Sequence, residues 1–285
     1  MPPRDAAHPI PGKRPSPSIS KVVRLYWAFA RVGFINTLAF RLRYYTGIVT
    51  YFIYVSVYYF IWKAIYAHSA SIEGFDFAHL LTYIGVGWII RSFYFNNIDQ
   101  DLAYQVIEGR LAMDLIKPVN IQVMYVARAA GESVFRLALL TVPTALVLFL
   151  VYPLRLPVGI GHAAAFLVSV LLSFLIVAAI NFAVGTFALR LQSILGLMRA
   201  KFFLLELFSG LLLPMTFFPH MVQKILGVMP FEYISYVPML IYLGKLNGGG
   251  LARAIAIQIF WVAILFALGD GLWRWSTRKV IIQGG

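Results

Sequence analysis

Residues 45–67 have the sequence YTGIVTYFIYVSVYYFIWKAIYA, an unbroken apolar and aromatic stretch whose one charge, Lys63, lies near its end. As an α-helix this stretch would be about 35 Å long, which exceeds the hydrocarbon core of a bilayer at about 30 Å. The long Lys63 side chain can extend to the interface from that position. The stretch therefore predicts a membrane-spanning helix, and it decides the class of fold.

The composition of the whole chain points the same way. Hydrophobic residues make up 61% of its 285 residues and charged residues 12%, whereas soluble domains average about 45–50% and about 25%. So few charges do not cover a water-facing surface of this size, and we expect the chain to lie in lipid. Cysteine is absent, which excludes disulfides, thiolate metal sites and cysteine nucleophiles.

Further apolar stretches predict further spans, at about residues 79–95, 133–152, 162–189, 202–213 and 251–273. Between residues 214 and 250 the chain stays apolar but is repeatedly broken by proline, which predicts short re-entrant or interfacial helices in place of a straight span. The predicted fold is an all-α polytopic membrane protein with six transmembrane helices and re-entrant helices between the fifth and sixth.

The N-terminal region differs from the rest. Residues 1–18 are rich in proline and lack the apolar run of a signal peptide, so we expect a disordered cytoplasmic tail. In residues 19–44 basic residues interrupt an aromatic, proline-free stretch, which predicts an amphipathic helix at the membrane surface. The alternative, a first span, would bury several charges. Residues 19–285 form one predicted transmembrane domain.

The basic residues are distributed unevenly about these spans. The net charge is +13, from 24 Lys and Arg against 11 Asp and Glu. Only Lys63, Arg155, Lys224, Lys245 and Arg253 fall on one side of the predicted topology, and the other basic residues fall with the termini. By the positive-inside rule both termini are cytoplasmic, in a bacterial-type cytoplasmic membrane. This distribution accounts for the charge without a nucleic-acid partner.

Chemical motifs are scarce. The chain has no phosphate-binding loop, dinucleotide-binding motif or serine nucleophile elbow, so any ATP chemistry must belong to another chain. Two acidic–basic pairs, Glu132 with Arg136 and Asp270 with Arg274, have helical i,i+4 spacing and are expected to neutralise each other. Glu206 has no such neighbour, and it either faces a substrate path or lies near the interface.

Arg91, near the end of the second predicted span, is expected to extend to the interface. After that span the chain becomes polar. Asn97, Asp99 and Asp101 offer capping oxygens and favourable charge for a helix start, and Gly109 separates that helix from a second short one that Pro118 ends. Such an amphipathic helix either docks on a soluble partner or rests on lipid headgroups. Its expected apolar face is formed by Leu111, Leu115 and Ile116.

Four segments carry a resemblance: IEGRLAMDLIKPV at residues 107–119, FSGLLLPMTFFP at 208–219, MPFEYISYVP at 229–238 and IYLG at 241–244. In their order and spacing across six spans, the chain resembles the membrane subunits of ABC-2-type transporters. It looks most like the small permeases that work with a separate ATPase chain.

The resemblance implies that the chain is a non-catalytic export permease and that it pairs with a second permease, identical or related. It also implies two copies of an ABC ATPase, which bind the ATP and magnesium. The coupling helix seated in the ATPase would involve Glu108, Gly109, Arg110, Leu111, Asp114, Leu115 and Lys117. The second and fifth spans would line the substrate path, with Glu206, Ser209 and Gly210 on the fifth. An outer gate would comprise Pro214, Pro219, Pro230, Glu232 and Pro238.

Two other classes of function stay open at this point. One is an ion-coupled secondary transporter, in which Glu206 would be the titrating group. The other is a membrane enzyme that modifies lipid, which would need a polar cluster with a nucleophile or metal ligands near one interface.

Overall fold

The computed structural model describes residues 19–38, 42–191 and 193–278, and the predicted tail at residues 1–18 lies outside them. The described chain is almost entirely helical, with one two-stranded antiparallel sheet. Its α-helices are α1 (Ile19–Leu38), α2 (Leu42–Ile65), α3 (Phe77–Tyr94), α4 (Ile98–Ile107), α5 (Leu111–Leu115), α6 (Ile121–Arg136), α7 (Val142–Val151), α8 (Ile160–Thr186), α9 (Leu195–Phe208), α10 (His220–Leu226), α11 (Tyr236–Tyr242) and α12 (Gly248–Thr277). The strands are β1 (Ser71–Ile72) and β2 (Phe75–Asp76). Short turns of 3₁₀-helix occupy Tyr66–His68, Phe187–Leu189, Met215–Phe217 and Phe231–Tyr233.

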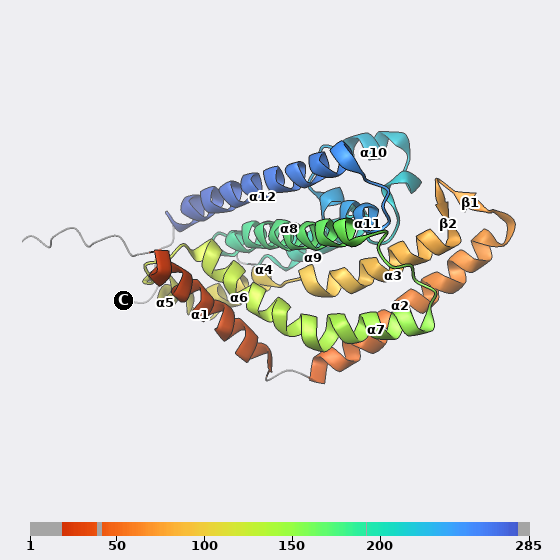
Figure 1. Ribbon diagram of the computed structural model, residues 1–285. Coiled ribbons are helices and arrows are strands. Elements are labelled where there is room, and N and C mark those ends of the chain that lie inside the picture. Colours follow the sequence, from red (N-terminus) through yellow and green to blue (C-terminus); the bar gives the residue numbers. More distant parts are fainter. Residues whose placement is uncertain (1–18, 39–41, 192, 279–285) are drawn as a thin grey trace, which may run out of the picture.

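The long helices run back and forth between two ends of a bundle (Figure 1). One end carries the β-hairpin, α10 and α11, and we call it the hairpin end. The other carries α5, the start of α1 and the end of α12, and we call it the α5 end. The joined α6 and α7, α8 and α12 run from one end toward the other, whereas α2 and α3 run between the hairpin end and the middle of the bundle.

Four helical segments are long and apolar enough to cross a membrane, by length and composition: Tyr44–His68, Ile121–Val151, Ile160–Leu189 and Gly248–Thr277. Their outward faces are rich in exposed apolar side chains. The chain is therefore a multi-pass, all-α membrane protein. The other two predicted spans correspond to α3, of 18 residues, and α9, of 14 residues. At 14 residues α9 is only about 21 Å long.

Helix α3 forms the centre of the bundle. Nearly all of its residues from Leu80 to Tyr94 are buried, and it packs against α2 and α8. Because protein rather than lipid covers it, α3 has room for Gly85, Gly87 and Arg91, which a lipid-facing helix would not favour.

Helix α1 is a separate helix that ends at Leu38, and residues 42–44 belong to α2, so the predicted single helix over 19–44 is wrong at its C-terminal end. Helix α1 lies along α6 at backbone contact. A Cβ atom added at Gly33 would lie 2.1 Å from the carbonyl oxygen of Arg128, and one at Gly131 would lie 1.7 Å from that of Ala30. Glycine at both crossing points lets the two backbones touch.

The predicted third span starts too late. The helix begins at Ile121, and α6 and α7 form one continuous helix with a π-helical turn at Leu137–Thr141. Pro143 follows this turn, and its ring would clash with the carbonyl of the preceding helical turn in a regular α-helix. The wider π-turn accommodates that ring. Residues 121–132 are helical although they include Arg128 and Glu132, because these side chains form ion pairs with Asp114 and Arg136.

The proline-rich region forms short helices, as predicted. Pro214, Pro219 and Pro230 each lie immediately before a helical turn or helix, and Pro238 lies in the first turn of α11. Proline is tolerated at these positions because the first residues of a helix need no intrahelical amide donor.

Candidate functional site

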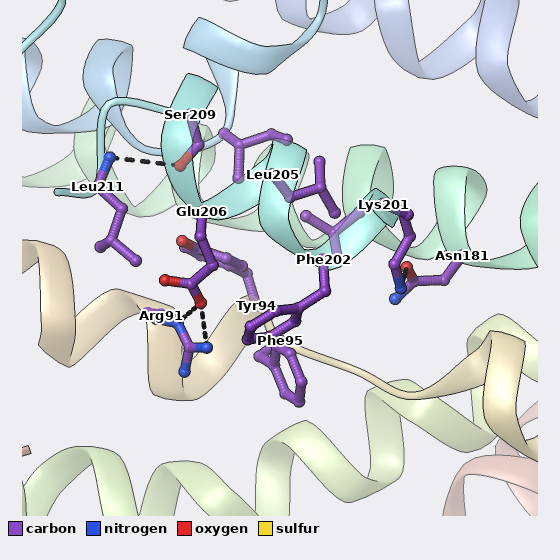
Figure 2. Close-up of a pocket in the computed structure, with 12 residues that line it drawn as sticks. Arg91, Tyr94, Phe95, Asn181, Lys201, Phe202, Leu205, Glu206, Ser209 and Leu211 are labelled. Carbon is purple, nitrogen blue, oxygen red and sulfur yellow. Dashed lines mark hydrogen bonds and ion pairs between the residues drawn. The ribbon is translucent and has the colours of Figure 1, made fainter. Parts of the chain in front are cut away.

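An ion pair joins α3 to α9 in the interior of the bundle (Figure 2). The Arg91 guanidinium donates through Nε to Glu206 Oε1 at 2.7 Å, and through a second nitrogen to the same oxygen. It also donates to the Tyr51 hydroxyl at 3.2 Å. The Arg91 and Glu206 side chains are only 13% and 17% exposed. The expectation that Arg91 extends to the interface is therefore wrong, because Glu206 neutralises its charge inside the protein.

Aromatic rings surround this pair. The Arg91 guanidinium carbon lies 5.2 Å from the ring centroid of Trp88, 5.0 Å from that of Phe95 and 5.8 Å from that of Phe202. Tyr54 stacks on Trp88 with centroids 4.6 Å apart. Cation–π contacts of this kind strengthen as water is excluded.

A cavity of about 440 Å³ opens beside the ion pair. Its walls combine hydroxyl groups and aromatic rings with this one buried charge pair. They are formed by Thr46, Gly47, Thr50, Tyr51, Tyr54, Trp88, Arg91, Phe202, Glu206 and Leu212. Of the three predicted path residues, Glu206 thus lines the cavity. The contributing helices are α2, α3 and α9, and α2 was not part of the expectation.

Ser209 and Gly210 do not line this cavity. Both are at the end of α9, where the Ser209 carbonyl accepts from the Tyr236 amide at 2.9 Å and the Gly210 carbonyl accepts from the Tyr83 hydroxyl. Gly210 has φ of 79°, and a Cβ atom there would lie 2.7 Å from Tyr236 Cβ. These residues end α9 and fasten it to α3 and α11, and Ser209 also borders a small pocket beside Glu206.

A second buried polar cluster lies nearer the α5 end. Lys201 Nζ of α9 donates to Asp99 Oδ2 of α4 at 2.8 Å and to Asn181 Oδ1 of α8 at 2.6 Å. The Asn181 amide donates to Asn96, at its carbonyl and its side-chain oxygen. Asp99 is therefore an ion-pair partner and does not cap α4, but with Asp101 it lies in the first turn of that helix, where its charge is favourable as predicted. Asn97 occupies the capping position, but its side chain makes no capping hydrogen bond.

The segment between α4 and α6 follows the predicted pattern in part. Gly109 has φ of 70°, a conformation that favours glycine, and it separates α4 from α5 as predicted. Leu111 is buried, but Leu115 is 36% exposed and Ile116 is 81% exposed, so the predicted shared apolar face is wrong. The exposed apolar side chains here are Ile107, Met113, Leu115 and Ile116.

Asp114 anchors α5 to the bundle. Its carboxylate accepts from Lys117 Nζ at 2.5 Å, from the Tyr125 hydroxyl at 3.2 Å and from the Arg128 guanidinium at 3.4 Å. Burial alone would raise the pKa of Asp114, but the Lys117 hydrogen bond and the Arg128 charge outweigh it and hold the pKa below its usual value. In contrast, Glu108 and Arg110 form an exposed pair at 3.0 Å, available to a partner.

The residues predicted for an outer gate gather at the hairpin end with α10 and α11 (Figure 1). Pro214 and Pro238 are buried, Pro230 and Glu232 are partly buried, and Pro219 is exposed. Hydrogen bonds tie the loops of this end together: Lys245 Nζ donates to the Gly74 carbonyl at 2.6 Å, and the Tyr242 hydroxyl donates to the Arg155 carbonyl at 3.0 Å.

The two local ion pairs predicted from helical spacing are present. Arg136 and Glu132 lie 3.9 Å apart, and Arg274 and Asp270 lie 2.6 Å apart. Within the described part of the chain, no group of three or more His, Asp and Glu residues is placed to hold a metal ion.

These features define a polytopic helical membrane protein with a polar cavity between helices and an exposed amphipathic segment at one end. The sequence matches a family model described as ABC-2 family transporter protein over residues 52–284, and the chain belongs to that family. This match confirms the resemblance seen in the sequence. A search among curated proteins found no match to the chain.

Proposed function

We propose that this chain is the membrane-spanning permease of an ATP-driven ABC exporter, with ATP hydrolysed by a separate chain. The observation that carries the proposal is the family match over residues 52–284. In this proposal the chain itself is non-catalytic and holds no cofactor, and ATP and magnesium bind to two copies of an ABC ATPase.

Six crossings by α2, α3, α6–α7, α8, α9 and α12 are part of the proposal, with α10 and α11 as re-entrant helices of an outer gate. The alternating direction of these helices in Figure 1 supports it. The described basic residues near the α5 end include Lys21, Arg24, Arg110, Lys117, Arg190 and Arg278. Their accumulation supports a cytoplasmic α5 end and an inner-membrane location.

The segment around α5 is the proposed contact with the ATPase. Glu108, Arg110 and the exposed side chains of Ile107, Met113 and Ile116 face away from the bundle, while Asp114 holds α5 in place. A short element with exposed apolar and charged groups on a rigid base suits a groove on a soluble subunit.

The proposed substrate path is the cavity beside Arg91 and Glu206. Helix α9 contains no buried residue, and Phe202, Phe203 and Leu204 on it are exposed. A second permease, identical or related, that packs against this side would close the cavity and cover α9. ATP binding would then move the α5 segments and open the path for export.

The alternatives are less well supported. In the ion-coupled alternative Glu206 would have to leave Arg91, to which it is bound in this structure. A lipid-modifying enzyme would need a nucleophile or metal-binding cluster, and the polar groups of the cavity are instead the hydroxyl groups of one face of α2 and an ion pair.

The first experiment is to tag the chain, extract it gently from its native membrane and identify every stoichiometric partner by mass spectrometry. A P-loop ATPase, alone or with a second permease of similar size, is the expected result. A chain that purifies without any ATPase would overturn the proposal and favour the ion-coupled or enzymatic alternatives.

Charge reversal at the proposed contact gives a second test. Glu108→Arg places two like charges at positions 108 and 110 on the exposed surface. We expect export to fall by about 5- to 150-fold relative to ATP hydrolysis, the range given by coupling free energies of about 1–3 kcal/mol. Export and hydrolysis are measured together in vesicles, with Glu73→Arg in the β-hairpin as control. Wild-type coupling in Glu108→Arg would move the contact elsewhere.

A further inference from the structure

The attachments of α9 to the rest of the chain are both apolar and polar. No residue of α9 is fully buried, but Leu205 packs against the core and Phe208 contacts the rings of Phe218 and Phe231. Two ion pairs, Glu206 with Arg91 and Lys201 with Asp99, hold α9 in addition. Its position therefore depends in part on the partners of these two charged side chains.

The two ion pairs connect α9 to different helices. Arg91 belongs to α3 and Asp99 belongs to α4, and the chain between them leaves helical geometry at Phe95, where ψ is 132°. Lys201 and Glu206 are five residues apart, or about 7.5 Å along α9. Helix α9 thus bridges the break between α3 and α4, with one charge on each side of it.

The Lys201 cluster is buried and well satisfied. The Lys201 and Asp99 side chains are 12% and 3% exposed, and Asn181 completes the hydrogen bonding of the ammonium group. Beneath it, α4 packs tightly on α8: a Cβ atom added at Gly185 would lie 2.9 Å from Asp99 Cα. A movement of α4 against α8 must therefore displace Asp99, and Asp99 is bound to Lys201.

Helix α4 also leads directly to α5. Only Glu108, Gly109 and Arg110 separate the two helices. A displacement of α5 by a partner thus reaches α4 through a very short connection, and α4 reaches α9 through Lys201. Meanwhile Arg91 holds Glu206 on the other side of the break, so α9 would tilt rather than move as a whole.

We infer that the Lys201–Asp99 ion pair is the joint that passes movement of the α4–α5 segment to α9, the helix that lines the cavity. Lys201 and Asp99 are positioning residues in this inference, since neither lines the 440 Å³ cavity itself. The inference rests on the proposed function, because it takes the ATPase as the source of the movement.

The test uses the full transporter complex in lipid nanodiscs. The chain has no cysteine, so spin labels can be placed at introduced cysteines alone. A label at Met113 on α5, or at Phe203 on α9, is paired with a label at Leu171 on α8, and all three positions are exposed in the single chain. Because Met113 and Phe203 belong to the proposed ATPase and permease contacts, only labelled complexes that retain ATP-driven export are measured. Both distances are measured without nucleotide and with ATP and vanadate.

The critical variant is the neutral double substitution Asp99→Asn with Lys201→Met. It removes the ion pair without leaving a buried unpaired charge, so it is expected to fold. We expect the α5 distance to change with ATP and vanadate as in wild type, and the change at α9 to be lost. A pair that only stabilised the fold would leave the α9 change intact in this variant, and that result would overturn the inference.

Two further variants complete the design. The charge swap Asp99→Lys with Lys201→Asp is expected to restore the α9 change, at least in part. Neutralising the exposed pair of α12, by Asp270→Asn with Arg274→Met, is expected to leave both changes as in wild type. If the α5 distance does not change with ATP and vanadate in the wild-type complex, the proposed function is contradicted, and so is the inference about the Lys201–Asp99 pair.

Discussion

At the scale of single residues, Glu206 and Arg91 combine two demands that oppose each other. A charge inside a helical bundle is costly to desolvate, yet the substrate path that we propose needs polar groups. The pair meets both, because each side chain neutralises the other while one face of the pair lines the cavity. Trp88, Phe95 and Phe202 add favourable contacts to the guanidinium.

Truncating one partner of the Arg91–Glu206 pair should therefore lower the stability of the protein much more than replacing both partners. Glu206→Ala leaves Arg91 buried and unpaired, and we expect a loss of about 3–5 kcal/mol in stability. Glu206→Met combined with Arg91→Met should recover most of that loss. The melting temperature of the detergent-solubilised protein, followed by size-exclusion chromatography after heating, measures both. Unchanged melting in Glu206→Ala would show that the pair carries no stability.

The anchor of α5 should depend on pH. The pKa of Asp114 is lower in the folded chain than its usual value of 3.8, so its contribution to stability is present above that value and is lost as the pH falls through the folded pKa. Asp114→Asn removes this contribution at every pH. We expect the variant to release α5 to proteolysis faster than wild type at pH 7, and the difference to vanish in strong acid. Equal rates of proteolysis for wild type and Asp114→Asn at pH 7 would show that Asp114 does not anchor α5.

Sequence alone could not have paired these residues. Arg91 and Glu206 are 115 positions apart, and Lys201 and Asp99 are 102 apart, whereas local spacing only connects residues one helical turn apart. The same spacing correctly gave the Glu132–Arg136 and Asp270–Arg274 pairs, since both partners lie on one helix.

At the scale of helices, the length of an uninterrupted apolar stretch was enough to predict α2, α8 and α12, because lipid-facing helices must be apolar over their whole length. It was not enough for α6, which carries Gln122, Arg128, Glu132 and Arg136 and packs against α1. Nor did it show where α1 ends and α2 begins, since both are helix-forming and no proline separates them. Packing between helices, rather than contact with lipid, decided those boundaries.

The crossing of α1 and α6 gives a prediction at this scale. Gly131→Ala puts a methyl group 1.7 Å from the Ala30 carbonyl oxygen, so the two backbones must separate. We expect a loss of about 1–3 kcal/mol, as for other overpacked sites. Gly161→Ala in α8 is the matched control, because a Cβ atom there would meet no atom within 4 Å. A thermal melt that does not distinguish the two variants would contradict the close contact.

At the scale of the whole molecule, the central question is which helices cross the bilayer. The open cases are α3 and α9, which are not among the four segments long and apolar enough to span a membrane. Helix α3 is buried among other helices, and α9 is short. If both cross, the β-hairpin and α10 lie on one side of the membrane, and α5 and the α8–α9 connection lie on the other. If either does not, the alternation of the bundle fails at that helix.

Single cysteines in this cysteine-free chain can answer it. Exposed positions are available at both ends: Ala70 and Met221 at the hairpin end, Met113 and Ser193 at the α5 end. In intact cells we expect a membrane-impermeant maleimide to label Ala70→Cys and Met221→Cys, and to label Met113→Cys and Ser193→Cys only after permeabilisation. Positions 70 and 113 flank α3, and positions 193 and 221 flank α9. Equal labelling at positions 70 and 113 would therefore show that α3 does not cross the bilayer, and equal labelling at positions 193 and 221 would show the same for α9. If positions 113 and 193 were labelled in intact cells and positions 70 and 221 only after permeabilisation, the α5 end would face outward and could not meet a cytoplasmic ATPase.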